Sequence, residues 1–282
     1  MLKVALAPAI TASPVSAAER VVAIGGDVTE IIFALGAGDR LIGVDSTSQY
    51  PPEAEDLPDI GYMRRLSAEP IVALMPDLVL ASGSSQPEVV LRQLENAQLD
   101  VVMIPDEPDV RGVVAKIKAV GDALELKAEA SELAADIERT VAEIDMALRH
   151  VEAHPRVLFL LNIGRGAPLT AGRDTSAASI IALAGGQNAI DGFEGYKPLS
   201  QEAAIAAAPE IVLMPTTTLE ALGGSAALFE RPELRFSPAA ANRQVIAMDG
   251  LLLLGFGPRL SEAVTKLAQA FHPDLKFGAS RP

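Results

Sequence analysis

Tyr62 follows a glycine in a short polar segment, with Arg64 and Arg65 close behind it, and it is one of only three tyrosines in the chain. A phenol has a pKa of about 10 in water, and a nearby guanidinium or a ferric ion favours its phenolate form. Tyr62 could therefore supply the anionic oxygen ligand that ferric haem accepts. The spacing also fits an amphipathic loop residue that packs on the protein surface, and taken alone it favours this second interpretation.

A second tyrosine and further cations lie in other segments that we expect to be loops after strands, where a ligand could contact them. Tyr196 follows a glycine as Tyr62 does, and Lys197 comes directly after it. Arg165 and Arg173 could neutralise carboxylates of a ligand within a chain that is otherwise acidic. Taken singly, each charge is more simply a surface residue, and Tyr196 fits a packing role as well as a role in the site.

Glu69 and Glu202 occupy matching positions, each two residues after a serine that can begin a helix. A carboxylate in the first turn of a helix is stabilised by the helix dipole, which is a sufficient structural explanation. Neither segment is a capping box, because the acid falls one position short of the required spacing. The functional alternative is that the two carboxylates are paired contacts for a symmetric, basic partner.

The chain has little of what covalent or metal-dependent catalysis requires. It contains no cysteine and three histidines, so thiol nucleophiles, disulfides and thiolate metal sites are excluded. His150 and His154 have the spacing of a metal pair on a helix, but Pro155 follows at once and indicates a frayed end. The glycine-rich nucleotide motifs and the serine-hydrolase motif are absent. We therefore expect no catalytic residues.

Composition narrows the class of partner and the location. The net charge of -14 opposes binding to nucleic acid or to anionic membranes. No segment reaches the about 18 apolar residues of a membrane span, so no direct membrane insertion is expected. Residues 1–18 combine an early lysine, a short apolar run and small residues, which predicts the remnant of a secretory signal and export to the periplasm. A cytosolic leader is the alternative.

An internal repeat organises the chain. Residues 66–81 read LSAEPIVALMPDLVLA and residues 199–214 read LSQEAAIAAAPEIVLM. Both contain L-S-x-E, apolar residues at helical spacing, a proline, an acid and an apolar run that suits a buried strand. Two further matches lie upstream in the same order. Repeated supersecondary units of this kind predict two copies of one α/β unit.

Short apolar runs alternate with helical segments in both copies. The expected strands are 21–24, 41–44, 78–80 and 101–104 in the first copy, and 157–161, 211–213 and 245–248 in the second. This alternation predicts an α/β protein with two similar lobes, each with a parallel sheet covered by helices. Ligands bind beyond the carboxyl ends of such strands, so we expect a ligand cleft between the lobes.

One long amphipathic helix is expected to join the two lobes. Between 127 and 150 the apolar residues recur at helical spacing, with charged residues and alanine between them. A helix of this length spans roughly 35 Å, enough to reach from one lobe to the other as a stiff connection. The expected organisation is an N-terminal lobe at 19–125, a connecting helix at 126–154 and a C-terminal lobe at 155–282.

Several segments together resemble the substrate-binding proteins of bacterial ABC importers for haem, vitamin B12 and ferric siderophores. They are GDRLIGVD at 38–45, YPP at 50–52, LPDIGYMRRLSAEP at 57–70, PDLVL at 76–80, AGRDTSA at 171–177, ALAGGQNA at 182–189 and GYKPLSQEA at 195–203. The resemblance covers nearly the whole chain, and G-Y-M-R-x-L-S-A-E is similar to the periplasmic haem-binding members.

The resemblance implies how such a protein works. Haem would be held between the lobes as a transported ligand and delivered to an ABC permease dimer with a cytoplasmic ATPase. Tyr62 would be the axial ligand to the haem iron, and Arg64 would steady the phenolate or a propionate. Glu69 and Glu202 would dock on arginines of the two permease subunits.

One loop departs from the pattern of the family. Some members carry a histidine in the loop after the first strand of the second lobe, whereas residues 161–166 here read LNIGRG. A second axial ligand is therefore not expected from this loop, and Asn162 or Arg165 would contact the haem edge or a propionate instead. We expect a periplasmic haem-binding protein, monomeric when free. The alternatives are a carrier of cobalamin or a ferric siderophore, in which Tyr62 only lines the cleft, and a two-lobed enzyme.

Overall fold

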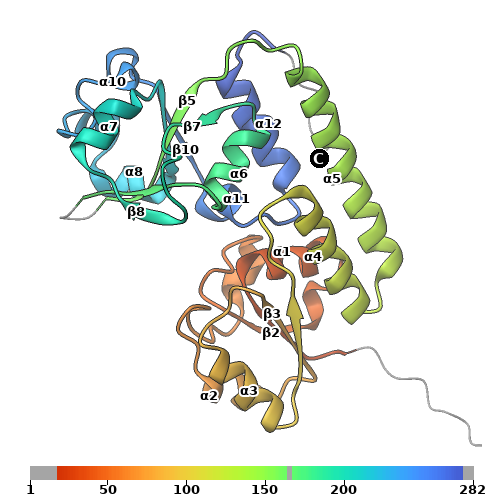
Figure 1. Ribbon diagram of the computed structural model, residues 1–282. Coiled ribbons are helices and arrows are strands. Elements are labelled where there is room, and N and C mark those ends of the chain that lie inside the picture. Colours follow the sequence, from red (N-terminus) through yellow and green to blue (C-terminus); the bar gives the residue numbers. More distant parts are fainter. Residues whose placement is uncertain (1–17, 164–166, 276–282) are drawn as a thin grey trace, which may run out of the picture.

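The computed structural model describes residues 18–163 and 167–275. Residues 1–17 of the expected leader, together with Arg165, lie outside this part of the chain. The protein consists of two α/β lobes, with one long helix running along the side of both (Figure 1). The prediction of two α/β lobes joined by a long helix is confirmed.

The sheet of the N-terminal lobe is entirely parallel and has the strand order β2-β1-β3-β4. Helices cover both of its faces, and every residue of the central strands β1 and β3 is buried, all of them apolar except Ser82. The strands are β1 Val21–Ile24, β2 Leu41–Val44, β3 Leu78–Ser82 and β4 Asp100–Ile104. The helices are α1 Gly26–Ala34, α2 Ala68–Ala73, α3 Glu88–Asn96 and α4 Val110–Ala123, with short 3-10 turns at Gly38–Arg40 and Pro52–Asp56.

Helix α5, Lys127–Leu148, is the connection predicted from the apolar spacing. It packs on α4 of the first lobe and on α12, Leu260–Phe271, of the second. The buried residues along it belong to a single apolar cluster that extends from Val21 in β1 to Phe271 in α12. Because this core is shared, we expect the two lobes to move relative to each other by small rocking.

The second sheet is mixed, which differs from the parallel sheet expected for this lobe. Its strand order is β10-β9-β5-β6-β8, with β7 also pairing with β5. Strands β10, β9, β5 and β7 are parallel, but β6 runs antiparallel to both β5 and β8. The strands are β5 Arg156–Asn162, β6 Leu169–Ala171, β7 Gln187–Asn188, β8 Tyr196–Pro198, β9 Ile211–Pro215 and β10 Val245–Met248.

Seven helices complete the described part of the C-terminal lobe, and several of them are only one or two turns long. They are α6 Ser176–Leu183, α7 Gln201–Ala207, α8 Thr216–Leu222, α9 Ser225–Phe229, α10 Pro238–Asn242, α11 Gly250–Leu254 and α12. None of the helices in the described ranges is long and apolar enough to cross a membrane.

Strand β8 places Tyr196 and Lys197 differently from the loop expected for them. Their backbone pairs with β6, where Tyr196 lies opposite Ala171 and Lys197 opposite Thr170. All three residues of β8 are exposed, so the strand has no alternation of buried and exposed side chains that a sequence could reveal. The repeat therefore preserves the Gly-Tyr dipeptide while changing its backbone from a turn around Tyr62 to an edge strand.

Candidate functional site

A cleft of about 500 Å³ lies between the lobes, beyond the carboxyl ends of β1, β2 and β3. Two of the predicted site residues, Tyr62 and Arg64, lie in its N-terminal wall. The same wall also contains Ser46, Thr47, Met63 and Asp106. Its C-terminal wall is mainly apolar and includes Leu161, Tyr196, Leu251, Leu254 and Phe256. The cleft thus combines an apolar surface with a small number of polar groups, as is typical of small-molecule sites.

Tyr62 is presented to this cleft by a loop that is fixed on both sides. The preceding Gly61 has a φ of 96°, a conformation that favours glycine, and its carbonyl accepts the Ser46 amide at 3.0 Å. The carbonyl of Met63 accepts the Gln86 amide at 2.7 Å. The Tyr62 side chain itself is 41% exposed. Its backbone is therefore held in place while its ring remains accessible to a ligand.

Tyr196 lines the opposite wall and is close to the charge of Arg64. Tyr196 is 37% exposed as a whole residue, but its phenol is partly buried against the protein, and this burial raises its pKa above the ordinary value. Contacts with Ala177 and Thr175 and the charge of Arg64 oppose the shift. The guanidinium from the first lobe therefore acts on the phenol of the second. Two tyrosines and one arginine of the sequence prediction line the same cleft.

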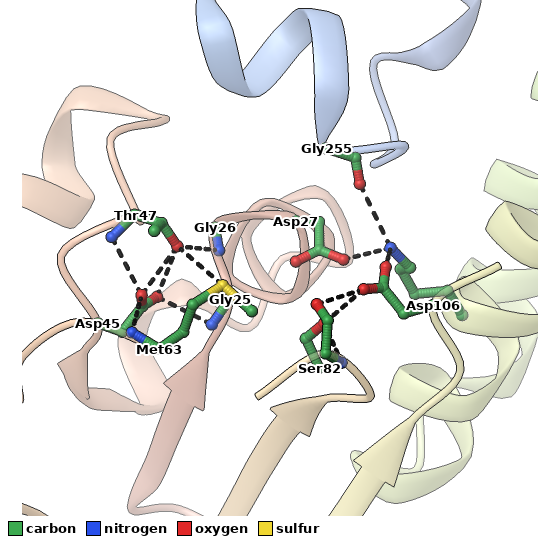
Figure 2. A network of polar contacts seen from close by, with 11 residues as sticks. Gly25, Gly26, Asp27, Asp45, Thr47, Met63, Ser82, Asp106 and Gly255 are labelled. Atoms are coloured by element: carbon green, nitrogen blue, oxygen red, sulfur yellow. Dashed lines mark hydrogen bonds and ion pairs between the residues drawn. The ribbon is translucent and has the colours of Figure 1, made fainter. Parts of the chain in front are cut away.

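The floor of the cleft contains a buried ion cluster that no sequence motif predicted (Figure 2). Lys116 is completely buried, and its ammonium donates to Asp27, to Asp106 at 2.8 Å and to the Gly255 carbonyl of the other lobe at 3.3 Å. Burial lowers the pKa of Lys116, but the two carboxylates reverse this effect and raise the pKa overall. With Lys116 charged and both carboxylates ionised, the cluster carries one net negative charge.

Asp106 is the member of this cluster that has the more accessible carboxylate. Its side chain is 27% exposed, against 8% for Asp27. The hydroxyls of Ser82 and Ser84 donate to its Oδ2 at 3.1 and 2.6 Å. A ligand with carboxylates is repelled from this end of the cleft and attracted to the end where Arg64 lies.

A second ion pair joins the lobes beside the floor. Arg259, next to the start of α12, donates to the buried carboxylate of Glu30 in α1, with Nε at 3.1 Å. The Arg259 guanidinium also lies 3.6 Å from the centre of the Tyr50 ring. Burial raises the pKa of Glu30, and the contact with Arg259 partly offsets this shift. These contacts fix the first lobe to the second.

Two of the predicted cations contact their own lobe instead of the cleft. The Arg173 guanidinium donates to the Asp191 carbonyl at 2.7 Å and pairs with Glu194 at 3.3 Å. The Lys197 ammonium lies 5.0 Å from the centre of the Phe193 ring. Both residues lie outside the lining of the cleft.

Two more predicted contacts also lie outside the described cleft lining. Arg65 is exposed in the turn after Tyr62, and Asn162 is the exposed last residue of β5. Arg165 belongs to the segment that is not described. The spacing after a strand indicates which residues lie near an edge of the sheet, but it does not indicate which of their side chains face the cleft.

The histidine pair does not form a metal site within the described residues. His154 Nδ1 lies 2.8 Å from the Gly185 carbonyl, and the buried His272 contacts the same oxygen through Nε2 at 3.1 Å. His150 is exposed beyond the end of α5. Across the described ranges, no group of three His, Cys, Asp or Glu residues could hold a metal ion.

Glu69 and Glu202 are exposed in the first turns of α2 and α7. Ser200 caps its helix by accepting the Ala203 amide at 3.1 Å, whereas Ser67 makes no such bond. Hydrogen bonds from its own amide and from Ser200 lower the pKa of Glu202, so this carboxylate stays ionised in moderately acidic solution. Within residues 18–163 and 167–275, neither glutamate forms an ion pair.

Each of these glutamates has an exposed aliphatic residue one turn further along its helix. Val72 is 41% exposed and Ile205 is 54% exposed. They occupy the same position of the repeat, three residues after Glu69 and Glu202, and so lie on the same helix face as the carboxylate. Both helices lie on the side of the molecule away from α5 (Figure 1).

No motif in the sequence predicted the apolar C-terminal wall or the ion cluster. Residues 250–257 read GLLLLGFG, an apolar run between glycines that could have been recognised as a wall near a strand end. Lys116 lies in a helix whose pattern is otherwise ordinary, and Asp27, its more deeply buried partner, is 89 positions away in the sequence. Its burial therefore had no local signal.

The periplasmic binding protein family matches residues 21–251, which is most of the chain. The chain belongs to this family. Its structure is similar to the periplasmic heme-binding protein RhuT from Roseiflexus sp. RS-1 in apo form, with 42% identity, a TM-score of 0.87 and coverage of 90% of this chain and 98% of that one. The periplasmic heme-binding protein BhuT in complex with two hemes is also 42% identical, with a TM-score of 0.86 and coverage of 91% and 99%.

A curated relative points to another ligand within the same class of protein. The vitamin B12-binding protein of Pectobacterium atrosepticum is 25% identical over 255 residues, which cover 89% of this chain and 90% of that protein. The predicted resemblance to haem and vitamin B12 carriers is thus confirmed. Members of this family bind substrates for transport.

Proposed function

We propose that this chain captures haem in the periplasm and delivers it to an ABC importer of the inner membrane. The observation that carries the proposal is the convergence of Tyr62 and Arg64 with Tyr196 on a cleft that has an apolar wall. A phenolate oxygen is a hard donor that suits ferric haem, and the apolar wall suits the faces of the macrocycle. The 42% identity to two periplasmic heme-binding proteins supports the same ligand.

In this proposal Tyr62 is the axial ligand, and charges set the orientation of haem. Arg64 would attract a propionate of the haem. Asp106 and the negative cluster around it repel the propionates from the floor. The haem would then enter with its apolar edge against Leu251 and Leu254. Capture would form the bond between the haem iron and the Tyr62 oxygen, and release would break it. No other covalent bond would change, so no catalytic residue is required.

The other predicted site residues would make additional contacts with the haem. Tyr196 would close the cleft from the second lobe, while Arg65, Asn162, Arg165, Arg173 and Lys197 would contact the ligand at the rim of the cleft.

We also infer the boundaries of the lobes and the oligomeric state. The lobes would span 19–125 and 155–282, with the connection at 126–154, and the protein would be monomeric when free.

Two matched surfaces support docking on a dimeric permease. Glu69 with Val72, and Glu202 with Ile205, each combine an exposed carboxylate with an exposed aliphatic side chain. An apolar contact beside a charged one is typical of specific interfaces. Because the two surfaces repeat each other, they fit a permease whose two subunits present equivalent basic sites. A cytoplasmic ATPase would complete the importer.

Cobalamin is the second candidate ligand, because vitamin B12-binding relatives match along most of the chain. The test is a titration of the purified protein with hemin and, separately, with cyanocobalamin, followed by visible absorption against ligand without protein. The proposal predicts a saturable ferric haem spectrum with a phenolate charge-transfer band and no saturable change with cyanocobalamin. The opposite pattern would move the assignment to cobalamin.

A further inference from the structure

Asp45 is a buried residue that neither the motifs nor the proposed function has used. It lies directly after β2, and its side chain is 1% exposed. Its Oδ1 accepts the Gly25 amide at 2.8 Å, and its Oδ2 accepts the Thr47 amide at 3.1 Å and the Met63 amide at 3.2 Å (Figure 2). One carboxylate therefore joins the end of β1, its own loop and the loop that carries Tyr62.

Hydroxyl groups complete the set of bonds around this carboxylate. Thr47 Oγ1 lies 2.9 Å from both carboxylate oxygens and accepts the Gly26 amide at 2.9 Å. Ser48 Oγ donates to Oδ1 at 3.2 Å. The carboxylate accepts hydrogen bonds at both oxygens, and its near-complete burial keeps it from a ligand. Its contribution is to hold loops in one arrangement.

The bond from the Met63 amide matters because Met63 follows Tyr62 directly. On the other side of Tyr62, the Gly61 carbonyl accepts the amide of Ser46, which is the residue after Asp45. Two consecutive residues, Asp45 and Ser46, thus bond to the residues on either side of Tyr62. Fixing a side chain before its ligand arrives removes an ordering cost from binding.

We propose that Asp45 is the positioning residue for Tyr62, holding the backbone on one side of the tyrosine so that its phenol oxygen is already placed for the ligand in the cleft. This inference rests on the proposed function of Tyr62 as the haem ligand. It assigns to Asp45 no contact with haem.

Asn is the sharpest replacement, because it keeps the shape of Asp45 and changes one acceptor oxygen into an NH₂ group. An NH₂ group cannot accept a backbone amide, so Asp45→Asn leaves either the Gly25 bond or the Thr47 and Met63 bonds unmade. Asp77→Asn is the matched control. Asp77 also accepts backbone amides in this lobe, from Glu19 at 3.3 Å and Arg20 at 3.1 Å, but it lies before β3 and away from the cleft.

The experiment compares wild type, Asp45→Asn and Asp77→Asn by hemin titration and by hydrogen exchange of the Met63 amide without ligand. We expect Asp45→Asn to bind hemin at least tenfold more weakly, with a shifted charge-transfer band and faster exchange at Met63. Asp77→Asn should match wild type in all three. Thr47→Val removes two of the contacts to Asp45 and keeps the carboxylate. It should give smaller changes in hemin affinity, band position and Met63 exchange, in the same directions. This variant replaces Asp45→Asn in the test if Asp45→Asn does not fold.

The experiment distinguishes a failure of the positioning role of Asp45 from a failure of the proposed haem binding. If wild type binds hemin and Asp45→Asn, or Thr47→Val in its place, keeps the wild-type band and affinity, the positioning role is wrong while the proposed function stands. If wild type does not bind hemin, the proposed function fails. The Met63 exchange rate then decides the remaining claim, since an unchanged rate in the variant contradicts anchoring of the Tyr62 loop by Asp45.

Discussion

Replacing Lys116 with methionine removes the single cation from the buried cluster at the floor of the cleft. The Lys116 side chain is 0% exposed, while those of Asp27 and Asp106 are 8% and 27% exposed. Removing one partner from a buried pair leaves an uncompensated charge and costs about 3–5 kcal/mol. At roughly 2–4 °C per kcal/mol for a protein of this size class, Lys116→Met should lower the Tm by roughly 6–20 °C at neutral pH.

The pH dependence of this loss has a definite sign. Burial already raises the pKa of Asp27, and the attraction to Lys116 opposes that shift. In the variant this attraction is absent, so the folded state binds a proton at higher pH than the unfolded state does. The stability difference between wild type and Lys116→Met should therefore narrow as the pH falls toward 4.

Thermal and urea unfolding at neutral and acidic pH measure this effect. Lys127→Met is the matched control, because Lys127 and Asp122 form an exposed pair at 3.6 Å with side chains 75% and 64% exposed. Such a pair contributes about 0–1 kcal/mol. The reasoning is refuted if Lys116→Met is as stable as Lys127→Met at neutral pH.

Three further predictions concern the ligand, the histidine and the docking surfaces. Arg64→Ala should weaken hemin binding about tenfold, equal to about 1.4 kcal/mol, because a propionate loses its cation; absorption titration measures this. Burial lowers the pKa of His272, so the folded state resists protonation and loses stability as the pH falls below about 6.5; urea unfolding should show a weaker decline for His272→Gln. Replacing Glu69 and Glu202 together with alanine should leave hemin affinity unchanged and reduce haem transfer to the importer in proteoliposomes.

The first two predictions have matched controls. Arg92→Ala removes an exposed arginine of α3 that lies outside the cleft lining, and an equal loss of affinity in it would contradict a specific role for Arg64. His150→Gln replaces an exposed histidine and should keep the wild-type decline with pH. Unaltered transfer by the doubly substituted glutamate variant would exclude these surfaces as the docking contacts.

Periodic signals explain why much of the fold could be predicted. The spacing of apolar residues predicts helix α5, and short apolar runs predict strands β1, β2 and β9. These elements lie in the core, where burial imposes a repeating pattern on the sequence. The repeat also located Tyr62 and Tyr196 as equivalent positions before any geometry was known.

The remaining features depend on contacts between distant residues. Strand β8 is exposed and short, so Tyr196 was expected in a loop. Lys116 and Asp27 are 89 positions apart, and nothing near either residue predicts their contact. Asp45 was visible only as a residue after a strand, although it accepts amides from three loops.

The central claim is that Tyr62 binds the iron of haem in the cleft. Its most direct test is the visible spectrum of the hemin complex for Tyr62→Phe beside Tyr50→Phe, since Tyr50 is similarly exposed at 43% but lies under Arg259 and outside the cleft lining. We predict that Tyr62→Phe loses the phenolate charge-transfer band and most of the affinity, while Tyr50→Phe keeps both. A Tyr62→Phe complex with the wild-type spectrum would contradict the account.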